Sequence, residues 1–455
     1  MKQDLLKKYN IPVPRYTSYP PANYFNESFD DKKYEIAIDL SNRQEPEHLS
    51  FYFHIPFCRR LCHYCGCNSY PVAQPEVTDR YVEALHKEID MVAKHIDKQR
   101  RIAQIHFGGG TPTILPPARL RELVDHLKKN FPAIPDPEIA IECHPGYLTE
   151  QFWTGLVTAG FNRVSLGIQD FNETVLKTVN RLPSLMPVEE IVCLLHASGI
   201  RVNMDFLYGL PHQTEKNFAR TIEKAAGMSP DRLVTFSYAH VPWVNKHQLI
   251  LEKAGLPSGE EKSKMYETAR KILCENSYFP IGLDHFVQKN DELYTALQNG
   301  QLHRNFQGYC TRRTTGQVYA FGVTGISQLS GAYAQNSKDI IGYIERIENG
   351  QFATAKGYAL SKQEQITREV IEALMCNYRI DWKDLSERLD IPVRDIKNET
   401  AYDEQRLQEF ADDGIIEFDT DHIRMTSEGT LFVRNVAASL DRLMLHSDKS
   451  FSKPV

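Results

Sequence analysis

Short runs of β-branched and aromatic residues alternate with longer amphipathic stretches between about residues 50 and 285. The stretches at 78–96 and 117–131 carry apolar residues at the i, i+3, i+4 and i+7 spacing of a helix. This alternation predicts an α/β fold, with βαβ units around a parallel sheet. Six units are too few for a closed eight-fold barrel, so we expect an open or partial barrel with its chemistry at the carboxyl ends of the strands. The predicted strands are 49–55, 103–107, 138–142, 163–168, 201–206 and 232–238.

The last third of the chain has a different pattern. From about 286 to 360, glycine, glutamine, asparagine and threonine are frequent, which predicts loops or strands that extend the barrel or cover it as a lid. Three helical stretches and a hairpin pattern follow, at 361–378, 381–389, 403–414 and 415–426. Helices followed by a hairpin are typical of a winged helix. Residues 381–425 carry 14 acidic and 6 basic side chains, the wrong sign for nucleic acid, so we expect a structural or capping domain.

We therefore divide the 455 residues into an N-terminal arm over the active site (1–48), a barrel with its extension (49–360) and a mostly helical, winged-helix-like domain (361–455). The net charge of −6 gives no overall attraction to nucleic acid or anionic lipid. No run of 18 apolar residues occurs, and the N-terminus lacks the apolar segment of a signal peptide. These features predict a cytoplasmic protein whose thiols stay reduced.

Four of the nine cysteines lie within ten residues, directly after the first predicted strand: Cys58, Cys62, Cys65 and Cys67. An odd number of cysteines in a cytosolic chain indicates metal binding or catalysis. Three thiolates at C-x3-C-x2-C spacing can bind a cubane iron–sulfur cluster and leave one iron open to a small molecule. A structural zinc site is one alternative, although Cys143 and His144 are the nearest further ligands. A redox disulfide between Cys62 and Cys65 is another.

A glycine-rich segment, HFGGGTPT at 106–113, follows the second predicted strand. Glycines let a backbone approach a ligand closely and expose its N–H groups. A glycine triplet by itself is also typical of a tight turn. Its place one βα unit after the cysteines predicts that both loops belong to one site.

The three cysteines and the GGGTP loop resemble the radical S-adenosylmethionine superfamily. Within it, the chain resembles the oxygen-independent coproporphyrinogen III oxidases over nearly its whole length. The segments that carry this resemblance are PRYTSYP (14–20), FHIPFCRRLCHYCGCN (53–68), HFGGGTPT (106–113), SLGIQDFN (165–172), VNR (179–181), MDFLYGLPHQT (204–214), FSYAHVPW (236–243), GLDHF (282–286) and NFQGY (305–309).

The resemblance implies a partial (β/α)6 radical-SAM barrel and a [4Fe-4S] cluster on Cys58, Cys62 and Cys65. It also implies two S-adenosylmethionine molecules per active site. An external donor would supply an electron that cleaves one of them to a 5′-deoxyadenosyl radical, which takes hydrogen from a propionate of coproporphyrinogen III. Loss of CO2 and of one electron to an unidentified acceptor leaves a vinyl. Two such steps would give protoporphyrinogen IX in heme biosynthesis.

The same resemblance assigns roles to single residues. Tyr52 contacts the cluster-bound cofactor; without the resemblance it would be a core tyrosine. Glu142 ends a strand, where its carboxylate can accept from a ribose hydroxyl or an amino group. Gln169, Arg181 and Asp205 hold the second S-adenosylmethionine, with the Arg181 guanidinium on its carboxylate. Without the resemblance, each of these side chains would be interpreted as part of a surface ion pair. Further cofactor contacts implied are Tyr64, Gly109, Gly110, Thr111, Ala239 and Ile326.

Other residues are open questions in the sequence. Cys67 forms a C-x-C with Cys65, and we expect it to serve the substrate or the electron path instead of the cluster; a buried thiol is the alternative. Cys310 follows NFQGY, where the family more often has threonine.

We expect the protein to be a monomer. The substrate's four carboxylates need cations, which are offered by Arg15, Arg304, Arg312 and Arg313.

Three rival functions remain at this stage. A heme chaperone of the same superfamily shares the three cysteines and GGGTP but lacks the C-x-C and the PRYTSYP arm. A heme-degrading, methyltransferase-type relative also lacks the C-x-C. A zinc-stabilised module that binds nucleic acid through its tail is disfavoured by the acidic charge of that tail.

Overall fold

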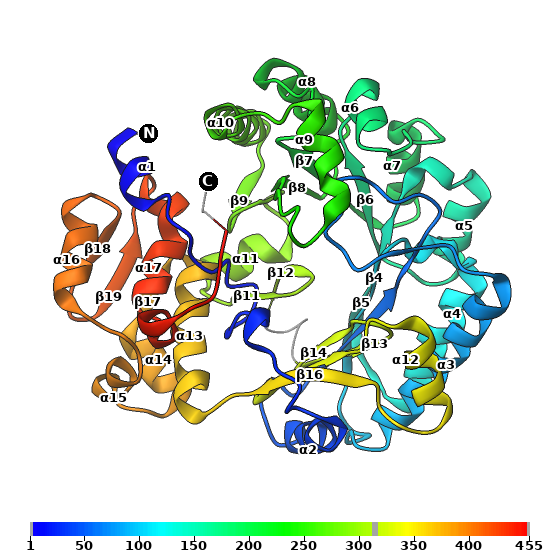
Figure 1. The fold of residues 1–455 in the computed structure, drawn as a ribbon, viewed down its shortest axis with the longest axis horizontal. Coiled ribbons are helices and arrows are strands. Elements are labelled where there is room, and N and C mark those ends of the chain that lie inside the picture. Colours follow the sequence, from blue (N-terminus) through cyan, green and yellow to red (C-terminus); the bar gives the residue numbers. More distant parts are fainter. Residues whose placement is uncertain (1–2, 312–316, 453–455) are drawn as a thin grey trace.

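The computed structural model describes residues 3–311 and 317–452. Its main feature is a curved sheet of twelve strands, in the order β16-β15-β14-β13-β1-β4-β5-β6-β7-β8-β10-β9 (Figure 1). The parallel strands are β1 (Leu49–Ile55), β4 (Ile102–Gly109), β5 (Ala133–Cys143), β6 (Arg163–Gln169), β7 (Arg201–Tyr208), β8 (Arg232–Ser237) and β13 (Gln317–Phe321). All six predicted strands are confirmed, and the sheet is open, as expected for a partial barrel.

The segment predicted to extend or cover the barrel extends it at one edge. β13 pairs in parallel with β1, a pairing that joins residues far apart in the sequence. The next three strands continue antiparallel: β14 (Ile326–Gln328), β15 (Ala332–Asn336) and β16 (Thr354–Ala359). At the other edge lie β9 (Phe279–Ile281) and β10 (His285–Val287).

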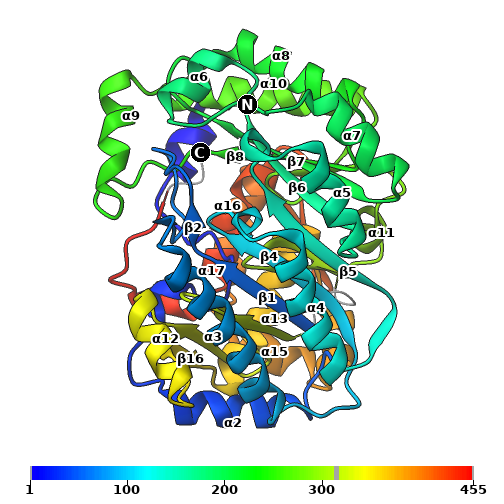
Figure 2. The ribbon, with the colours of Figure 1, turned by 90° about the vertical axis from the view of Figure 1, so that its right-hand side faces the viewer.

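Helices cover the outer face of the sheet (Figures 1 and 2). They are α3 (Pro75–Ala93), α4 (Pro117–Asn130), α5 (Glu150–Thr158), α6 (Glu173–Thr178), α7 (Val188–Ala197), α8 (Glu215–Gly227), α10 (Gly259–Glu275) and α12 (Ile340–Glu348). Successive strand residues point to opposite faces. On β1, Phe51 and Phe53 therefore join the aromatic core with Phe107 and Phe321, whereas Tyr52 faces the polar interior of the barrel beside His106.

The C-terminal part has a hydrophobic core of its own. Its helices are α13 (Lys362–Asn377), α14 (Trp382–Leu389), α15 (Val393–Glu399), α16 (Glu404–Asp412) and α17 (Val433–Ser439). A small sheet, in the order β17-β19-β18, joins β17 (Arg379–Asp381), β19 (His422–Met425) and β18 (Ile416–Phe418). The predicted hairpin is therefore confirmed, and a third strand pairs with it.

The N-terminal arm connects the two parts. It contains α1 (Gln3–Tyr9) and α2 (Asp31–Ser41). The hydroxyls of Tyr16 and Tyr19 both donate to the buried carboxylate of Asp441, each at 2.9 Å. On α2, Tyr34 shares a 2.8 Å hydrogen bond with Ser327 of β14. The arm is thus tied to the C-terminal core and to the barrel.

The remaining elements lie around the two sheets. β2 (Phe57–Cys58) pairs in parallel with β3 (Tyr70–Pro71). β11 (Leu302–Asn305) and β12 (Gly308–Thr311) form an antiparallel hairpin. The short helices are α9 (Leu249–Ala254), α11 (Glu292–Gln298), η1 (Ala22–Tyr24), η2 (Pro112–Ile114), η3 (Pro145–Tyr147), η4 (Lys246–Gln248), η5 (Gly429–Phe432) and η6 (Arg442–His446). Within the described ranges, no helix has both the length and the apolar character needed to cross a bilayer.

Candidate active site

A pocket of about 160 Å³ lies at the carboxyl ends of β1 and β4–β7, where the chemistry of a parallel barrel is expected. Twelve of the fifteen residues predicted from the sequence line it. They are Cys58, Cys62, Tyr64, Cys65, Cys67, Gly109, Gly110, Thr111, Glu142, Gln169, Arg181 and Asp205. Six segments of the chain, some of them strand ends and some loops, supply these residues, so the fold itself assembles the site.

The cysteine loop spans residues 59–69 between β2 and β3, and backbone hydrogen bonds fix both of its ends. Tyr70 N donates to Pro56 O at 2.8 Å and Val72 N donates to Cys58 O at 3.0 Å, while inside the loop Cys65 N donates to Cys62 O at 3.1 Å. His54 Nε2 bonds Asn68 O at 2.9 Å, while its Nδ1 faces the hydroxyl of Tyr52 at 3.2 Å. The loop is held in a defined shape before any ligand binds.

The three thiols of the C-x3-C-x2-C motif fit a multi-iron cluster. Cys58, Cys62 and Cys65 all line the same pocket. Across residues 3–311 and 317–452, no three His, Cys, Asp or Glu side chains converge on a point that could hold one metal ion. Thiolates of a [4Fe-4S] cluster each bind a different iron and need no such convergence. The described residues thus offer no three-ligand site for a single metal ion, and all nine cysteines, Cys62 and Cys65 included, are free thiols.

Cys65 and Cys67 differ in protonation although only one residue separates them. Hydrogen bonding from the Cys67 side chain lowers the pKa of Cys65 to about 6, against the opposing effect of burial. The same hydrogen bond and the nearby Cys65 charge raise the pKa of Cys67 well above its usual value. Thiolate, not thiol, binds metal. This difference agrees with Cys65 as a ligand and Cys67 as a neighbour that does not ligate.

The GGGTP loop packs directly on the cysteine loop. Gly109 has a φ of +111°, which side chains rarely adopt. A Cβ on Gly110 would lie 2.7 Å from Pro56 O and 3.0 Å from Cys58 Sγ. The Thr111 hydroxyl lies 3.3 Å from Cys58 Sγ. Glycine is therefore required here by close approach, as the sequence pattern predicted.

Glu142 projects into the pocket from the end of β5. Its carboxylate lies 3.1 Å from His106 Nε2, and its side chain is 42% exposed. Tyr52 stacks on His106 with ring centroids 5.9 Å apart. Tyr52 therefore stands behind Glu142 and His106 in the wall of the site and does not line the pocket itself.

The opposite wall is formed by β6, β7 and the loop after α6. Ser165 Oγ donates to Asp205 Oδ2 at 2.8 Å, and burial raises the pKa of Asp205 to about 7. Gln169 has a left-handed φ of 68°, a strained conformation of the kind that clusters at functional sites. Arg181 Nη1 donates to Cys62 Sγ at 3.6 Å, and its other nitrogen, Nη2, donates to Gly167 O.

Several predicted residues lie elsewhere. Ala239, after β8, touches the site indirectly because Gln248 Nε2 donates to its carbonyl and to that of Tyr64. Ile326 begins β14 and packs in the cluster around Phe25 and Tyr333, away from the pocket. Among the predicted cations, Arg15 and Arg304 lie beyond the pocket lining, and Arg312 and Arg313 fall outside the described residues.

The pocket also contains residues that the sequence did not predict as cofactor contacts: Arg60, Ser69, Cys143, His144, Ser165 and Gly167. The alternation of β6 carried a usable signal. Residues 163, 165, 167 and 169 share one face of that strand, so Gln169 implied Ser165 and Gly167. The sequence offers His144 only as a potential zinc ligand; in the structure, burial and the charge of Arg181 lower its pKa to about 3.

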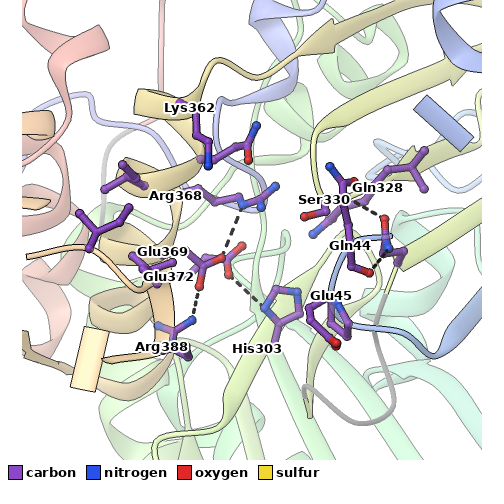
Figure 3. A pocket seen from close by; sticks show the side chains of 17 residues that line it. Gln44, Glu45, His303, Gln328, Ser330, Lys362, Arg368, Glu369, Glu372 and Arg388 are labelled. Atoms are coloured by element: carbon purple, nitrogen blue, oxygen red, sulfur yellow. Dashed lines mark hydrogen bonds and ion pairs between the residues drawn. The ribbon is translucent and has the colours of Figure 1, made fainter. Parts of the chain in front are cut away.

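Two other cavities adjoin the barrel. One of about 60 Å³ lies inside it and shares Ser165 with the pocket. Another, of about 600 Å³, lies between α13 and residues of the barrel side that include Glu45, His303 and Ser330 (Figure 3). Its ion pairs, such as His303 Nδ1 to Glu372 Oε2 at 3.1 Å, belong to the contact between barrel and C-terminal part. None of the predicted site residues lines this larger cavity.

Comparison with known proteins agrees with this geometry. The Radical SAM superfamily matches residues 52–225, and the HemN C-terminal domain matches residues 360–432. The oxygen-independent coproporphyrinogen III oxidase of Synechocystis sp. is 37% identical over 456 residues, covering 99% of this chain and 97% of its own. The enzyme of that name from Escherichia coli is 38% identical over 442 residues, covering 96% and 94%.

A solved structure agrees as well. Coproporphyrinogen III oxidase (HemN) from Escherichia coli, described as a radical SAM enzyme, superposes with a TM-score of 0.88 at 36% identity. The match covers 97% of this chain and 98% of that one. The similarity therefore includes the arm, the barrel and the C-terminal part.

Proposed function

The chain belongs to the family of oxygen-independent coproporphyrinogen III oxidases, and we propose that it converts two propionates of coproporphyrinogen III to vinyls, giving protoporphyrinogen IX in heme biosynthesis. The observation that carries this function is the single pocket in which the three thiols of the cysteine loop meet Glu142, Arg181 and Asp205. The full-length similarity to oxidases of that name supports it over a heme chaperone.

Cys58, Cys62 and Cys65 would hold a [4Fe-4S] cluster, with one S-adenosylmethionine against the GGGTP loop. When bound, these groups supply a 5′-deoxyadenosyl radical that can abstract hydrogen. Each propionate then loses a β-hydrogen atom, CO2 and one electron. The exposed N–H groups of the loop and the Glu142 carboxylate suit the polar groups of the cofactor.

Arg181, Gln169 and Asp205 would bind a second S-adenosylmethionine. Arg181 has a fixed position because Gly167 O and Cys62 Sγ both accept from it. A planar guanidinium suits a carboxylate. Asp205 faces the same space, and its Ser165 hydrogen bond orients the carboxyl. Tyr52, Tyr64, Ala239 and Ile326 remain proposed cofactor contacts, and Cys67 a proposed substrate or electron-path residue.

The electron donor would dock where the cysteine loop reaches the surface. Trp243 is 77% exposed and Val244 69%. His247 of the same segment bonds Cys65 O at 3.0 Å, so this surface adjoins the loop. Neither 59–69 nor 238–250 contains an acidic residue, whereas both contain basic ones. An acidic one-electron carrier protein complements that surface.

We further propose a monomer in the cytoplasm, with domain limits at 48/49 and 360/361. The nine free cysteines suit a reducing compartment. Large apolar side chains exposed among the described residues are few and mostly scattered, as on a monomer. Separate cores for the barrel and the C-terminal part support the second limit. The final electron acceptor is an external molecule of unknown identity.

An anaerobic assay tests the function. The cluster is reconstituted, and S-adenosylmethionine, reductant, coproporphyrinogen III and cell extract are added. Chromatography should detect protoporphyrin after oxidation together with 5′-deoxyadenosine. Deoxyadenosine without product, alongside tight heme binding, would favour the heme chaperone instead.

A further inference from the structure

Three arginines from distant segments meet where the N-terminal arm passes between the β11–β12 hairpin and α17 (Figure 1). They are Arg15 of the arm, Arg304 of β11 and Arg434 of α17. Arg434 Nε donates to Pro14 O at 3.1 Å, directly beside Arg15. Burial and the positive charges of Arg15 and Arg304 lower the pKa of Arg434 to about 10. The positive charges of Arg15 and Arg304 therefore act unfavourably on the Arg434 guanidinium.

The negative charge among them is insufficient. Asp284, the carboxylate of this cluster, already accepts from Arg15 Nη2 at 2.8 Å and from His285 Nδ1 at 2.7 Å. Burial disfavours its charge, yet His285, Arg304 and Arg15 together lower its pKa strongly. One buried carboxylate thus interacts with two arginines and a histidine.

Arg304 feels the charge of Asp284 but makes no ion pair within 4 Å among the described residues. It is 7% exposed. Its contacts among the described residues are a 3.4 Å hydrogen bond to the Tyr309 hydroxyl and a position 4.8 Å above the Tyr309 ring. Its Nε is buried with no hydrogen-bond partner. A buried charge without a partner is costly, so such a site is prepared for an anion.

The cluster is connected to the cofactor pocket. His285 and Tyr309 pack edge to face, with ring centroids 5.2 Å apart. Both line the 60 Å³ cavity inside the barrel, which shares Ser165 with the cofactor pocket. Asn305 also lines this cavity, and its Nδ2 is buried without a partner. Buried donors without a partner, Arg304 Nε and Asn305 Nδ2, thus lie between the arginine cluster and the small cavity beside the cofactor pocket.

We propose that Arg15 and Arg304 bind a propionate carboxylate of the substrate, with Arg434 as a positioning residue that fixes the arm. This inference rests on the proposed function and names its anion site. A tetracarboxylate can present one propionate to the cofactor pocket while another pairs with these guanidinium forks. Arg434 cannot serve directly, because Val13 O, Pro14 O and Ser452 O accept from it.

The test compares Arg304→Gln and Arg15→Gln with Arg100→Gln in the reconstituted holoenzyme. Arg100 is the matched control: it is also buried and lies 5.8 Å above a tyrosine ring, that of Tyr319, far from the cluster. Binding of coproporphyrin III and of its uncharged tetramethyl ester is measured by fluorescence quenching, and KM is measured for coproporphyrinogen III. S-adenosylmethionine affinity is measured in parallel.

We expect both cluster variants to weaken coproporphyrin III binding and raise KM about tenfold or more, as for loss of a charge-assisted hydrogen bond. Binding of the ester and of S-adenosylmethionine should not change, and Arg304→Lys should recover part of the loss. Unchanged affinity and KM in Arg15→Gln and Arg304→Gln would overturn the inference, as would equal binding of acid and ester by the parent. Because Arg15 is 41% exposed, its variant stays informative if Arg304→Gln misfolds. If the parent binds the acid selectively but forms no vinyl product, the proposed function fails and the anion site stands.

Discussion

Ser165 Oγ donates to Asp205 Oδ2 at 2.8 Å and thereby joins neighbouring strands β6 and β7 at the base of the cofactor pocket. Ser165 also lines the small cavity inside the barrel. Ser165 therefore borders both the pocket proposed for the cofactors and the cavity that His285 and Tyr309 line. Burial raises the pKa of Asp205 to about 7, so the pair changes charge near neutral pH.

The raised pKa of Asp205 predicts a pH-dependent stability in cofactor-free protein. The unfolded carboxyl has its pKa near 3.8 and the folded one near 7. The stabilisation is thus complete below about pH 4 and is lost as the pH rises through 7. Asp205→Asn should become more stable than the parent, by about 4 kcal/mol at pH 8, with the gap closing toward pH 4. Thermal unfolding of both proteins from pH 4 to 8 measures this difference in stability. A difference that does not change with pH would contradict the prediction.

The cysteine loop predicts unequal effects of its four cysteines. Alanine at position 58, 62 or 65 should abolish iron loading and turnover, because each removes one thiolate of the cluster. Cys67→Ala should retain the cluster. Iron content and the visible absorbance of anaerobically reconstituted protein measure this. A Cys58→Ala protein with full iron and activity would refute the assignment.

The contact between the two loops predicts a steric effect. Gly110→Ala places a Cβ 2.7 Å from Pro56 O and 3.0 Å from Cys58 Sγ. Backbone cannot yield cheaply, so we expect about 1–3 kcal/mol of destabilisation and reduced iron loading. Gly259→Ala is the control, since no atom lies within 4 Å of its new Cβ. Equal unfolding temperatures and iron contents in the two variants would speak against close packing.

The fixed guanidinium of Arg181 predicts the number of bound cofactors. Arg181→Lys removes the planar fork and should weaken one of two S-adenosylmethionine sites about tenfold or more. Equilibrium dialysis under anaerobic conditions should then give a stoichiometry near one instead of two at moderate concentration. Two sites of unchanged affinity would exclude this role for Arg181.

The exposed segment around Trp243 predicts a dependence on the reductant. Trp243→Ser should slow cluster reduction by a reduced acidic ferredoxin about tenfold, since exposed aromatic residues often dominate docking. Reduction by dithionite, which needs no docking surface, should proceed as in the parent. Ile341→Ser, an exposed apolar residue on α12, is the control. Equal losses with both reductants would assign the segment to another role.

Much of the fold was predictable from local patterns. Each of the six predicted strands exists because its β-branched and aromatic residues suit a pleated, buried surface. β1 even has the predicted bounds, Leu49–Ile55. The cysteine spacing and the glycine triplet were equally informative, because cluster binding and close backbone approach each demand particular residues within one short segment.

The sequence by itself thus determined the elements, the cluster loop and the family. Only the tertiary structure decided which distant residues meet. The parallel pairing of β13 with β1 joins segments more than 250 residues apart, and no local pattern encodes such a pairing. Likewise, Arg15 and Arg304 were both candidate cations in the sequence, but their approach to the carboxylate of Asp284 arises from packing of the arm against the hairpin. Side-chain burial and charge balance depend on all neighbours in space, and these exist only in the folded chain.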